Sequence, residues 1–328
     1  MKYNVAIVGA GLIGNKRVAA LQKFKNCQLI TVADVNLASA RNLAKEYGGE
    51  AVTDWQKVVA RPDVDVVIVS TSNQSLAEVS IAALKNKKHI LCEKPFGRNV
   101  KESKAILAAA KKSGRLVKVG FDHRFYPHVQ RAKEELDKGT IGRLLFIRGR
   151  YGHGGRVGLE KEWRAQKDIA GGGELLDQGT HLIDLCRWLG GEPTKVLGVV
   201  ETKFWPIKVE DNAFVILKNQ NTTSQFHVST NNWGNIFSLE LFGDKGAIFI
   251  DGKGGRYGQA ILKVGIKQLP YGDLKIKTFA YSDEEIGNSW VEEFKNLLGA
   301  IEGKAKISGD GYDGLRSNEI VEEVYKMN

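Results

Sequence analysis

The stretch Gly9-Ala10-Gly11-Leu12-Ile13-Gly14 restricts the fold of this chain more than any other segment. It follows the apolar run Val5-Ala6-Ile7-Val8 and precedes a window with apolar residues at helical spacing. Gly9 permits a tight turn, Gly11 lets a pyrophosphate approach the backbone, and Gly14 lets helix and sheet pack closely. The free amides of the helix that starts at Leu12 and Ile13 would face the phosphates. The segment predicts a dinucleotide-binding unit.

Asp34 strengthens that prediction because it ends the second apolar run, 20 residues beyond Gly14. Its carboxylate can accept hydrogen bonds from both hydroxyls of an adenosine ribose and would repel a 2′-phosphate. The alternative role, capping the next helix, suits Asn36 at least as well. Arg41, one helical turn further on, can still reach a 2′-phosphate. We therefore expect NAD as the cofactor, with NADP less favoured.

The first part of the chain alternates short apolar runs with amphipathic windows, which is typical of a parallel sheet with crossover helices. The predicted strands are Tyr3 to Gly9, Cys27 to Asp34, Val64 to Thr71, His89 to Cys92 and Leu116 to Phe121. The predicted helices are Leu12 to Phe24, Leu37 to Tyr47, Leu76 to Asn86 and Val100 to Lys112. We expect a doubly wound Rossmann domain over residues 1–121.

Residues 122–328 predict a second α/β domain for substrate binding and oligomerisation. Several strands follow one another without intervening helices, which favours an open, mostly antiparallel sheet. The segment Gly243-Asp244-Lys245-Gly246 is typical of a hairpin turn. Helices are expected over Pro127 to Lys138, Leu175 to Leu189, Ser289 to Ile301 and Tyr312 to Lys326, the last two able to pack back on the Rossmann domain.

Composition excludes some classes of protein. The net charge is +10, but the lysines are dispersed rather than gathered with aromatic residues, which argues against nucleic-acid binding. No segment has the ~18 consecutive apolar residues of a membrane span. Cys27, Cys92 and Cys186 lack metal-type spacing and predict buried, reduced thiols. The chain enters a strand without a signal peptide, and we expect a cytoplasmic protein without a metal site.

Three residues predict hydride-transfer chemistry. Lys94 follows the strand at His89 to Cys92, at the sheet edge where open α/β sheets bind ligands. Asp177 and His181 are four residues apart in a largely apolar helix that follows three glycines. A rim salt bridge for Lys94 and a surface pair for the other two are the structural alternatives.

Oxidation of a secondary alcohol needs a base for the hydroxyl proton, while the hydride passes to nicotinamide. His181 suits that role because its ordinary pKa lies near ~6.5. Asp177 would hydrogen-bond the substrate or orient the imidazole, and Lys94 would hold the reacting oxygen. The roles of Lys94 and His181 can be exchanged, since a lysine with a depressed pKa also transfers protons.

The glycine fingerprint, the Cys92-Glu93-Lys94-Pro95 segment and the segment from Gly171 to His181 together resemble the Gfo/Idh/MocA oxidoreductases. The resemblance covers essentially the whole chain. It implies a Rossmann domain followed by an α/β domain, often used for dimer or tetramer assembly. It also implies oxidation or reduction of sugars, inositols or nucleotide sugars with NAD or NADP, with Lys94, Asp177 and His181 as the catalytic residues.

The same resemblance implies cofactor contacts for Thr71, Asn73, Glu93 and Lys94. Asn73 could instead cap a helix, and Glu93 could be a surface charge. Many relatives have Thr-Pro-Asn followed three residues later by His, whereas this chain has Thr71-Ser72-Asn73 and then Leu76.

Substrate choice is expected in the segments 122–126, 151–156 and 163–164. They offer hydroxyl donors, arginines suited to carboxylate or phosphate, and aromatic faces suited to sugar rings. The candidates are Arg124, Tyr126, His153, Arg156, Trp163 and Arg164, with Lys94, Asp177 and His181. Each one could equally be structural. They favour a hexose derivative, which can be anionic or nucleotide-linked. The rival hypothesis is a non-catalytic NAD-binding sensor of the same fold.

Overall fold

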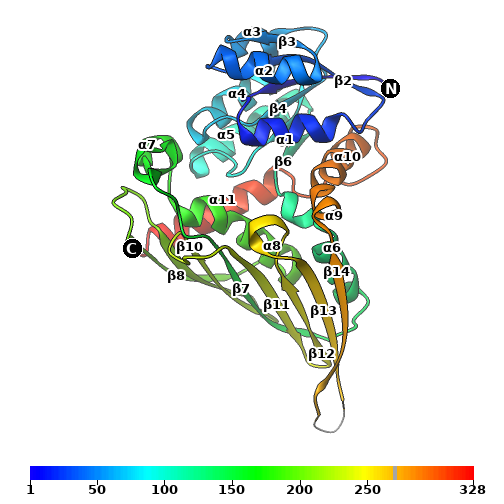
Figure 1. Cartoon of the computed structure of the whole chain (residues 1–328), viewed down its shortest axis with the longest axis vertical. Helices are drawn as coiled ribbons and strands as arrows, with labels where there is room; N and C mark the ends of the chain where they lie inside the picture. Colours follow the sequence, from blue (N-terminus) through cyan, green and yellow to red (C-terminus); the bar gives the residue numbers. More distant parts are fainter. Residues whose placement is uncertain (269–271) are drawn as a thin grey trace. The chain divides into compact units, whose positions relative to one another are not determined.

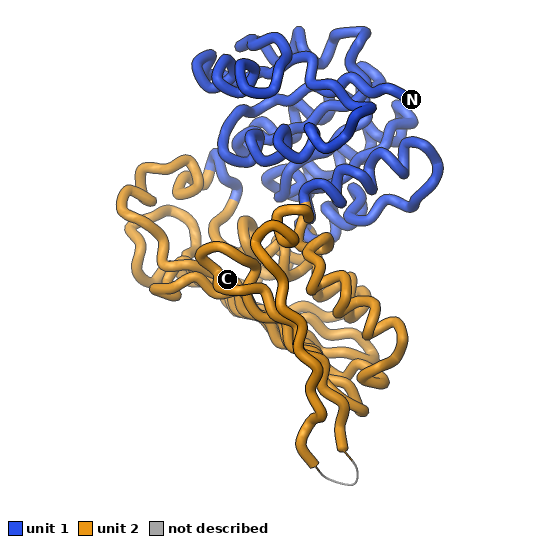
Figure 2. The backbone as a smooth tube through the Cα atoms, turned by 45° about the vertical axis from the view of Figure 1, so that its right-hand side comes forward, with its two compact units in different colours: residues 1–121, 168–171, 290–318 blue, residues 122–167, 172–289, 319–328 orange. Residues whose placement is uncertain are grey.

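The computed structural model describes residues 1–268 and 272–328 (Figure 1). These residues form two compact units (Figure 2). Unit 1 contains residues 1–121, 168–171 and 290–318. Unit 2 contains residues 122–167, 172–289 and 319–328.

Unit 1 is built around a six-stranded parallel sheet with the strand order β3-β2-β1-β4-β5-β6. The strands are β1 (Tyr3–Val8), β2 (Cys27–Ala33), β3 (Glu50–Val52), β4 (Val66–Val69), β5 (His89–Cys92) and β6 (Val117–Val119). This is the predicted Rossmann-type sheet. The sequence prediction missed β3 and the helix α3 (Trp55–Ala60) that follows it, because three residues are too few to show a periodic pattern.

Alternate residues of each strand point to opposite faces of this sheet, and each face has its own apolar core. Val5 and Ile7 pack with α1 (Leu12–Leu21), α2 (Leu37–Tyr47) and α10 (Ser289–Ile301). Ala6 and Val8 lie in the other core, which includes residues of α3, α4 (Asn73–Lys85) and α5 (Val100–Ser113). Both faces are covered, which explains why the strands read as continuous apolar runs.

Unit 2 contains an eight-stranded, mostly antiparallel sheet with the order β14-β13-β12-β11-β7-β10-β9-β8. The single parallel pair in it, among the residues described, joins β7 and β10. The strands are β7 (Leu144–Gly152), β8 (Lys195–Glu201), β9 (Asn212–Lys218), β10 (Thr223–Ser229), β11 (Ile236–Gly243), β12 (Gly246–Asp251), β13 (Ala260–Lys267) and β14 (Leu274–Tyr281). The predicted open sheet is confirmed.

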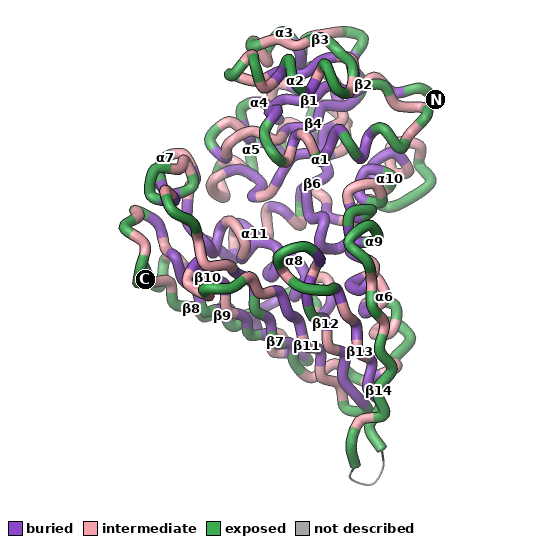
Figure 3. The backbone as a smooth tube through the Cα atoms, in the orientation of Figure 1, coloured by how far each residue is buried: buried purple, intermediate pink, exposed green. Residues whose placement is uncertain are grey.

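Helices cover one face of this sheet and leave the other exposed. The core of unit 2 joins strand residues to α6 (Pro127–Asp137), α8 (Thr180–Gly190) and the last part of α11 (Gly311–Tyr325). Two further short helices are α7 (Lys167–Ala170) and α9 (Asp283–Gly287). Figure 3 shows buried and exposed segments alternating along the strands, as the period of two requires.

Two local predictions need correction. The expected helix Leu175 to Leu189 starts as a π-helical turn, η4 (Leu175–Gly179), before α8 begins. The hairpin at Gly243 to Gly246 is present between β11 and β12, but neither glycine adopts a positive φ. A Cβ on Gly243 would lie 2.0 Å from Ile141 O, and one on Gly246 would lie 2.2 Å from Gly265 O. Close backbone packing, rather than turn conformation, requires both glycines.

The three cysteines are free thiols, as predicted, although Cys27 is only partly buried. None of the helices formed by residues 1–268 and 272–328 has the length and apolar character needed to cross a membrane.

Candidate active site

The glycine fingerprint forms the turn between β1 and α1. Gly9 has a φ of 104°, and a Cβ there would lie 2.4 Å from Ser70 O. A Cβ on Gly14 would lie 2.1 Å from Gly9 O, so that glycine brings the helix against the turn. A Cβ on Gly11 would meet nothing within 4 Å. The protein's own packing therefore does not require glycine at position 11, which fits a ligand that approaches the backbone there.

Asp34 lies beside the same turn. Its Oδ2 accepts a hydrogen bond from Ala10 N at 2.7 Å, and its Oδ1 accepts one from Asn36 N at 2.8 Å. Asn36 caps α2 through bonds from Ala38 N and Ser39 N, as the sequence suggested. The carboxylate of Asp34 is thus positioned at the fingerprint rather than used as a helix cap.

The predicted cofactor residues Thr71 and Asn73 follow β4. Thr71 Oγ1 donates to Ser72 O at 3.0 Å, and Asn73 Nδ2 donates to Ala170 O at 2.8 Å. The N-cap of α4 is Ser72, so Asn73 does not cap the helix. Sequence reasoning had no signal for Ala170, which is 97 residues away.

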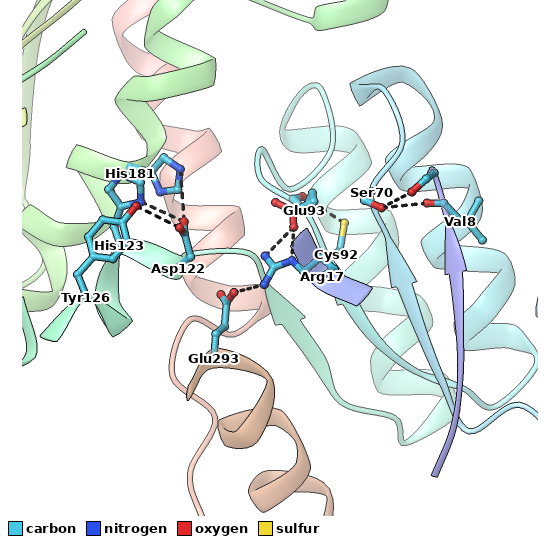
Figure 4. A network of polar contacts seen from close by, with 11 residues as sticks. Val8, Arg17, Ser70, Cys92, Glu93, Asp122, His123, Tyr126, His181 and Glu293 are labelled. Carbon is cyan, nitrogen blue, oxygen red and sulfur yellow. Dashed lines mark hydrogen bonds and ion pairs between the residues drawn. The ribbon is translucent and has the colours of Figure 1, made fainter. Parts of the chain in front are cut away.

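Glu93 and Lys94 follow β5. Glu93 is buried, so its alternative role as a surface charge is wrong. Its Oε1 accepts a hydrogen bond from Arg17 Nε at 2.6 Å, and Arg17 also pairs with the buried Glu293 (Figure 4). Lys94 is partly exposed, and its peptide bond to Pro95 is cis.

Asn318 holds the loop that follows Lys94 and Pro95. Its amide nitrogen donates to Phe96 O at 3.1 Å, to Gly97 O at 3.0 Å and to Ser103 Oγ at 2.8 Å. The loop therefore has a fixed path after Lys94. A separation of more than 200 residues hides this contact from sequence reasoning.

The three glycines before Asp177 are tightly packed. A Cβ on Gly172 would lie 2.1 Å from Tyr325 Oη, and one on Gly173 would lie 2.0 Å from Glu210 O. The partly buried Glu210 carboxylate accepts hydrogen bonds from Gly173 N, from Leu175 N and from Tyr325 Oη at 2.6 Å. Burial raises the pKa of Glu210. These bonds fix the start of the π-helical turn that carries Asp177.

Asp177 lies near an arginine, whereas His181 lies near a carboxylate. Asp177 Oδ2 lies 3.5 Å from Arg164 Nε, and the Arg164 guanidinium lies 4.4 Å from the Trp163 ring centre. His181 is buried, and its Nε2 lies 3.9 Å from Asp122 Oδ1. The structure thus joins three predicted residues, Trp163, Arg164 and Asp177, in one group.

His153 lies within electrostatic reach of that group. Burial lowers its pKa, and the charges of Arg156, Lys253 and Arg164 act in the same direction, against the opposing effect of Asp177. His153 Nδ1 accepts a hydrogen bond from Gly155 N at 3.0 Å, which leaves its other nitrogen as the donor.

Two predicted substrate-binding arginines are engaged elsewhere. Arg124 makes a bidentate ion pair with Asp184, at 2.7 and 2.6 Å, and both side chains are buried. Arg156 pairs with Glu162 on the surface. This geometry favours the structural alternative for Arg124. Tyr126 donates to Asp122 Oδ2 at 3.3 Å.

Sequence reasoning missed Lys253 and Tyr257 in the glycine-rich loop after β12. The Lys253 ammonium lies 4.3 Å from the Tyr257 ring centre and 5.0 Å from that of Tyr151. Burial raises the pKa of Tyr257 to about 12, so it is a hydrogen-bond donor at neutral pH. The sequence signal of this loop is its four glycines between 252 and 258, each of which has a positive φ in the structure.

Comparison with known proteins identifies the family. Residues 3–121 match the model described as "Oxidoreductase family, NAD-binding Rossmann fold", and residues 129–249 match the "GFO/IDH/MocA C-terminal domain". The chain belongs to the Gfo/Idh/MocA family. The fold expected from the resemblance is therefore confirmed.

Several similar proteins are named as dehydrogenases of a sugar or an inositol. Levoglucosan dehydrogenase of Pseudarthrobacter phenanthrenivorans is 37% identical over 210 residues, which are 61% of this chain and 54% of that enzyme. The match thus spans about half of that relative's length. Myo-inositol 2-dehydrogenase of Thermotoga maritima is 25% identical over 94% of this chain and 91% of its own. A structure of levoglucosan dehydrogenase with NADH and levoglucosan superimposes with a TM-score of 0.90 at 27% identity, covering 100% of this chain and 98% of the other.

Proposed function

We propose that this protein transfers a hydride between NAD and a ring hydroxyl or ketone of a sugar, inositol or nucleotide sugar. The observation that carries the proposal is His181, an imidazole held beside a buried carboxylate in a chain of the Gfo/Idh/MocA oxidoreductases. The similar proteins named for levoglucosan and myo-inositol support the class of substrate.

The residues of unit 1 fit a dinucleotide. The open space beside Gly11 and the amides at the start of α1 would take the pyrophosphate, and Asp34 would accept hydrogen bonds from the adenosine ribose. Thr71, Asn73 and Glu93 would contact the remainder of the cofactor. When bound, NAD supplies the acceptor for the hydride. The carboxylate of Asp34 favours NAD over NADP.

In this proposal, Lys94, Asp177 and His181 act on the substrate. His181 takes the hydroxyl proton during oxidation and returns it during reduction. Lys94 holds the reacting oxygen and stabilises negative charge on it, and Asp177 accepts a hydrogen bond from a neighbouring hydroxyl. The reverse assignment of Lys94 and His181 remains the second form of the mechanism.

His153, Trp163 and Arg164 are the proposed determinants of substrate choice. Trp163 offers an aromatic face to a sugar ring, and Arg164 and His153 offer donors to its hydroxyls. Tyr126 and Arg156 are weaker candidates for substrate binding, because Tyr126 donates a hydrogen bond to Asp122 and Arg156 pairs with Glu162.

We also propose that the protein is a homo-oligomer in the cytoplasm. The uncovered face of the sheet in unit 2 exposes large apolar side chains, and such a face is typical of an interface. They include Phe146, Leu197, Val199, Phe214, Ile216 and Ile276. Free thiols support the cytoplasmic location.

The test is a panel of sugars, inositols and nucleotide sugars, followed through the absorbance of NADH in both directions. The proposal expects turnover with at least one neutral or acidic pyranose or cyclitol. Tight NAD binding without turnover of any member would favour the alternative, a non-catalytic sensor. Isothermal titration with NAD separates that outcome from failure to bind cofactor.

A further inference from the structure

Asp122 is the centre of a buried group of polar side chains around His181. Its Oδ1 lies 3.0 Å from His123 Nδ1 and 3.9 Å from His181 Nε2, and its Oδ2 accepts the hydrogen bond from Tyr126 (Figure 4). Asp122, His123 and His181 are each at most 5% exposed. A carboxylate so far removed from water needs the hydrogen bonds of His123 and Tyr126 and the nearby His181 to remain ionised.

The two imidazoles lie face to face. The ring centres of His123 and His181 are 3.8 Å apart, with an angle of 22° between the ring planes. Two adjacent imidazolium ions repel each other, whereas one imidazolium and one neutral imidazole can stack beside a single carboxylate. The geometry therefore suits a state in which Asp122 is ionised and one of the two imidazoles, His123 or His181, carries an additional proton.

These three residues also have the side chains of a metal site, with ligand atoms within 4.8 Å of one another. A metal must lie in the plane of each imidazole that binds it, because the nitrogen lone pair lies in that plane. Two nearly parallel rings 3.8 Å apart cannot both direct their lone pairs at one ion. The stacking favours a proton over a metal.

We propose that Asp122 and His123 are positioning residues that set the basicity of His181. The negative charge of Asp122 stabilises the protonated form of His181. His123 holds the Asp122 carboxylate by a hydrogen bond, and a proton on His123 would use the same negative charge, which makes protonation of His181 less favourable. The role of this group in catalysis rests on the proposed function, whereas its effect on the pKa of His181 does not.

During oxidation the substrate O–H bond breaks, its proton binds a ring nitrogen of His181, and the hydride of the adjacent C–H bond passes to NAD. The new positive charge forms about 4 Å from Asp122, as the 3.9 Å separation shows. The proton then leaves to water, and the neutral imidazole is restored.

Other ionisable groups of unit 2 surround this group and bear on its titration. Tyr126 and His128 come from the start of α6, Tyr151 comes from β7, and Asp177 comes from η4. Lys253, from the loop after β12, acts on Asp122, and Arg124 beside His123 is paired with Asp184. Burial raises the pKa of Asp122, but the charges of His123, His181 and Lys253 outweigh it and hold that pKa below its ordinary value.

The test measures the pKa of His181 by NMR titration of its ring carbon-bound protons in the full chain, with assignment from His181→Gln. The sequence has six histidines, so the spectrum is simple. Asp122→Asn should lower the pKa of His181 by about 1–3 units, because an opposite charge at 4–6 Å is lost. His123→Phe keeps the stacked ring and should raise it, because the competitor is removed.

Asp137→Asn is the matched control, since that carboxylate pairs with Lys133 at the surface, and it should leave the pKa of His181 unchanged. If the substitutions at Asp122 and His123 both left this pKa unchanged, or moved it in the same direction, the inference would be overturned. A stoichiometric transition metal in the purified protein would overturn it too. Should either variant fail to fold, the wild-type titration decides: coupled two-step curves for His123 and His181 support the inference, and independent single-step curves contradict it.

The measurement needs no substrate, so a protein without dehydrogenase activity can still support or contradict this inference. If the protein is active, the acidic limb of kcat/KM for oxidation should move to lower pH in Asp122→Asn by the same amount as the NMR value.

Discussion

Arg17 Nε donates a hydrogen bond to Glu93 Oε1 at 2.6 Å, and both side chains are buried in unit 1. Arg17 lies on α1, behind the glycine fingerprint, and Glu93 immediately precedes Lys94. The same guanidinium pairs with Glu293 of α10 and lies 4.3 Å from the Trp290 ring centre. One arginine therefore joins the helix of the fingerprint, the loop of Lys94 and a C-terminal helix.

Arg17→Met should destabilise unit 1 by about 3–5 kcal/mol, because it leaves two buried carboxylates without their cation. Urea denaturation followed by tryptophan fluorescence measures the effect. Lys295→Met is the matched control: Lys295 pairs with Glu292 at the surface of α10, and its loss should cost less than about 1 kcal/mol. Equal effects of the two substitutions would show that the buried network is unimportant.

Asp34→Ala should weaken NAD binding and reduce the preference for NAD over NADP. The substitution removes the carboxylate that accepts hydrogen bonds from the ribose hydroxyls of NAD and repels the 2′-phosphate of NADP. Titration calorimetry with both cofactors measures this. Asp54→Ala is the control, because Asp54 also accepts two backbone hydrogen bonds at a helix start, without a predicted cofactor role. Unchanged affinities in Asp34→Ala would remove the residue from the site.

Acid should destabilise unit 2 through His128. Burial lowers the pKa of this histidine to about 4, whereas the unfolded chain has a value near ~6.5. Between these values the unfolded chain binds a proton that the folded chain does not. Stability is therefore fully present above pH 6.5 and is lost as the pH falls toward 4, by about 3 kcal/mol in total.

His128→Gln should flatten this part of the stability profile while its amide replaces the bond to Gly252 O. Melting temperatures at half-unit pH steps provide the measurement. His227→Gln, at a partly buried histidine with a lowered pKa, should have a smaller effect. A profile for His128→Gln as steep as that of the wild type would contradict the assignment.

Phe214→Lys should dissociate the proposed oligomer, because it places a charge in the exposed apolar face of the sheet in unit 2. Light scattering after gel filtration gives the mass. Val157→Lys, at an exposed apolar residue outside the strands, is the control and should leave the mass unchanged. A wild-type protein of 36.2 kDa in solution would exclude the oligomer.

The features that the sequence predicts are local ones. Gly9, Gly11, Gly14 and the capping residue Asn36 act within one turn or one helix start, so their residue types carry the information. Strand and helix positions follow from periods of two and 3.6 in the same way.

The remaining features depend on contacts between distant parts of the chain. The partners of Arg17 lie 76 and 276 positions away, and Asp122 meets His181 across 59 positions. A charged residue needs a partner when it is buried, but the sequence does not identify that partner. The π-helical turn before α8 also has no periodic signature, because five residues complete barely one turn.

Lys94 and His181 are proposed to serve one hydride-transfer reaction. The direct test is the pH dependence of NADH formation by the wild type, Lys94→Arg and His181→Gln, with the best substrate from the panel. We predict that kcat falls at least ~100-fold in both variants with NAD affinity unchanged, and that the acidic limb disappears in the variant that lost the base. Rates near those of the wild type in both variants would contradict the account.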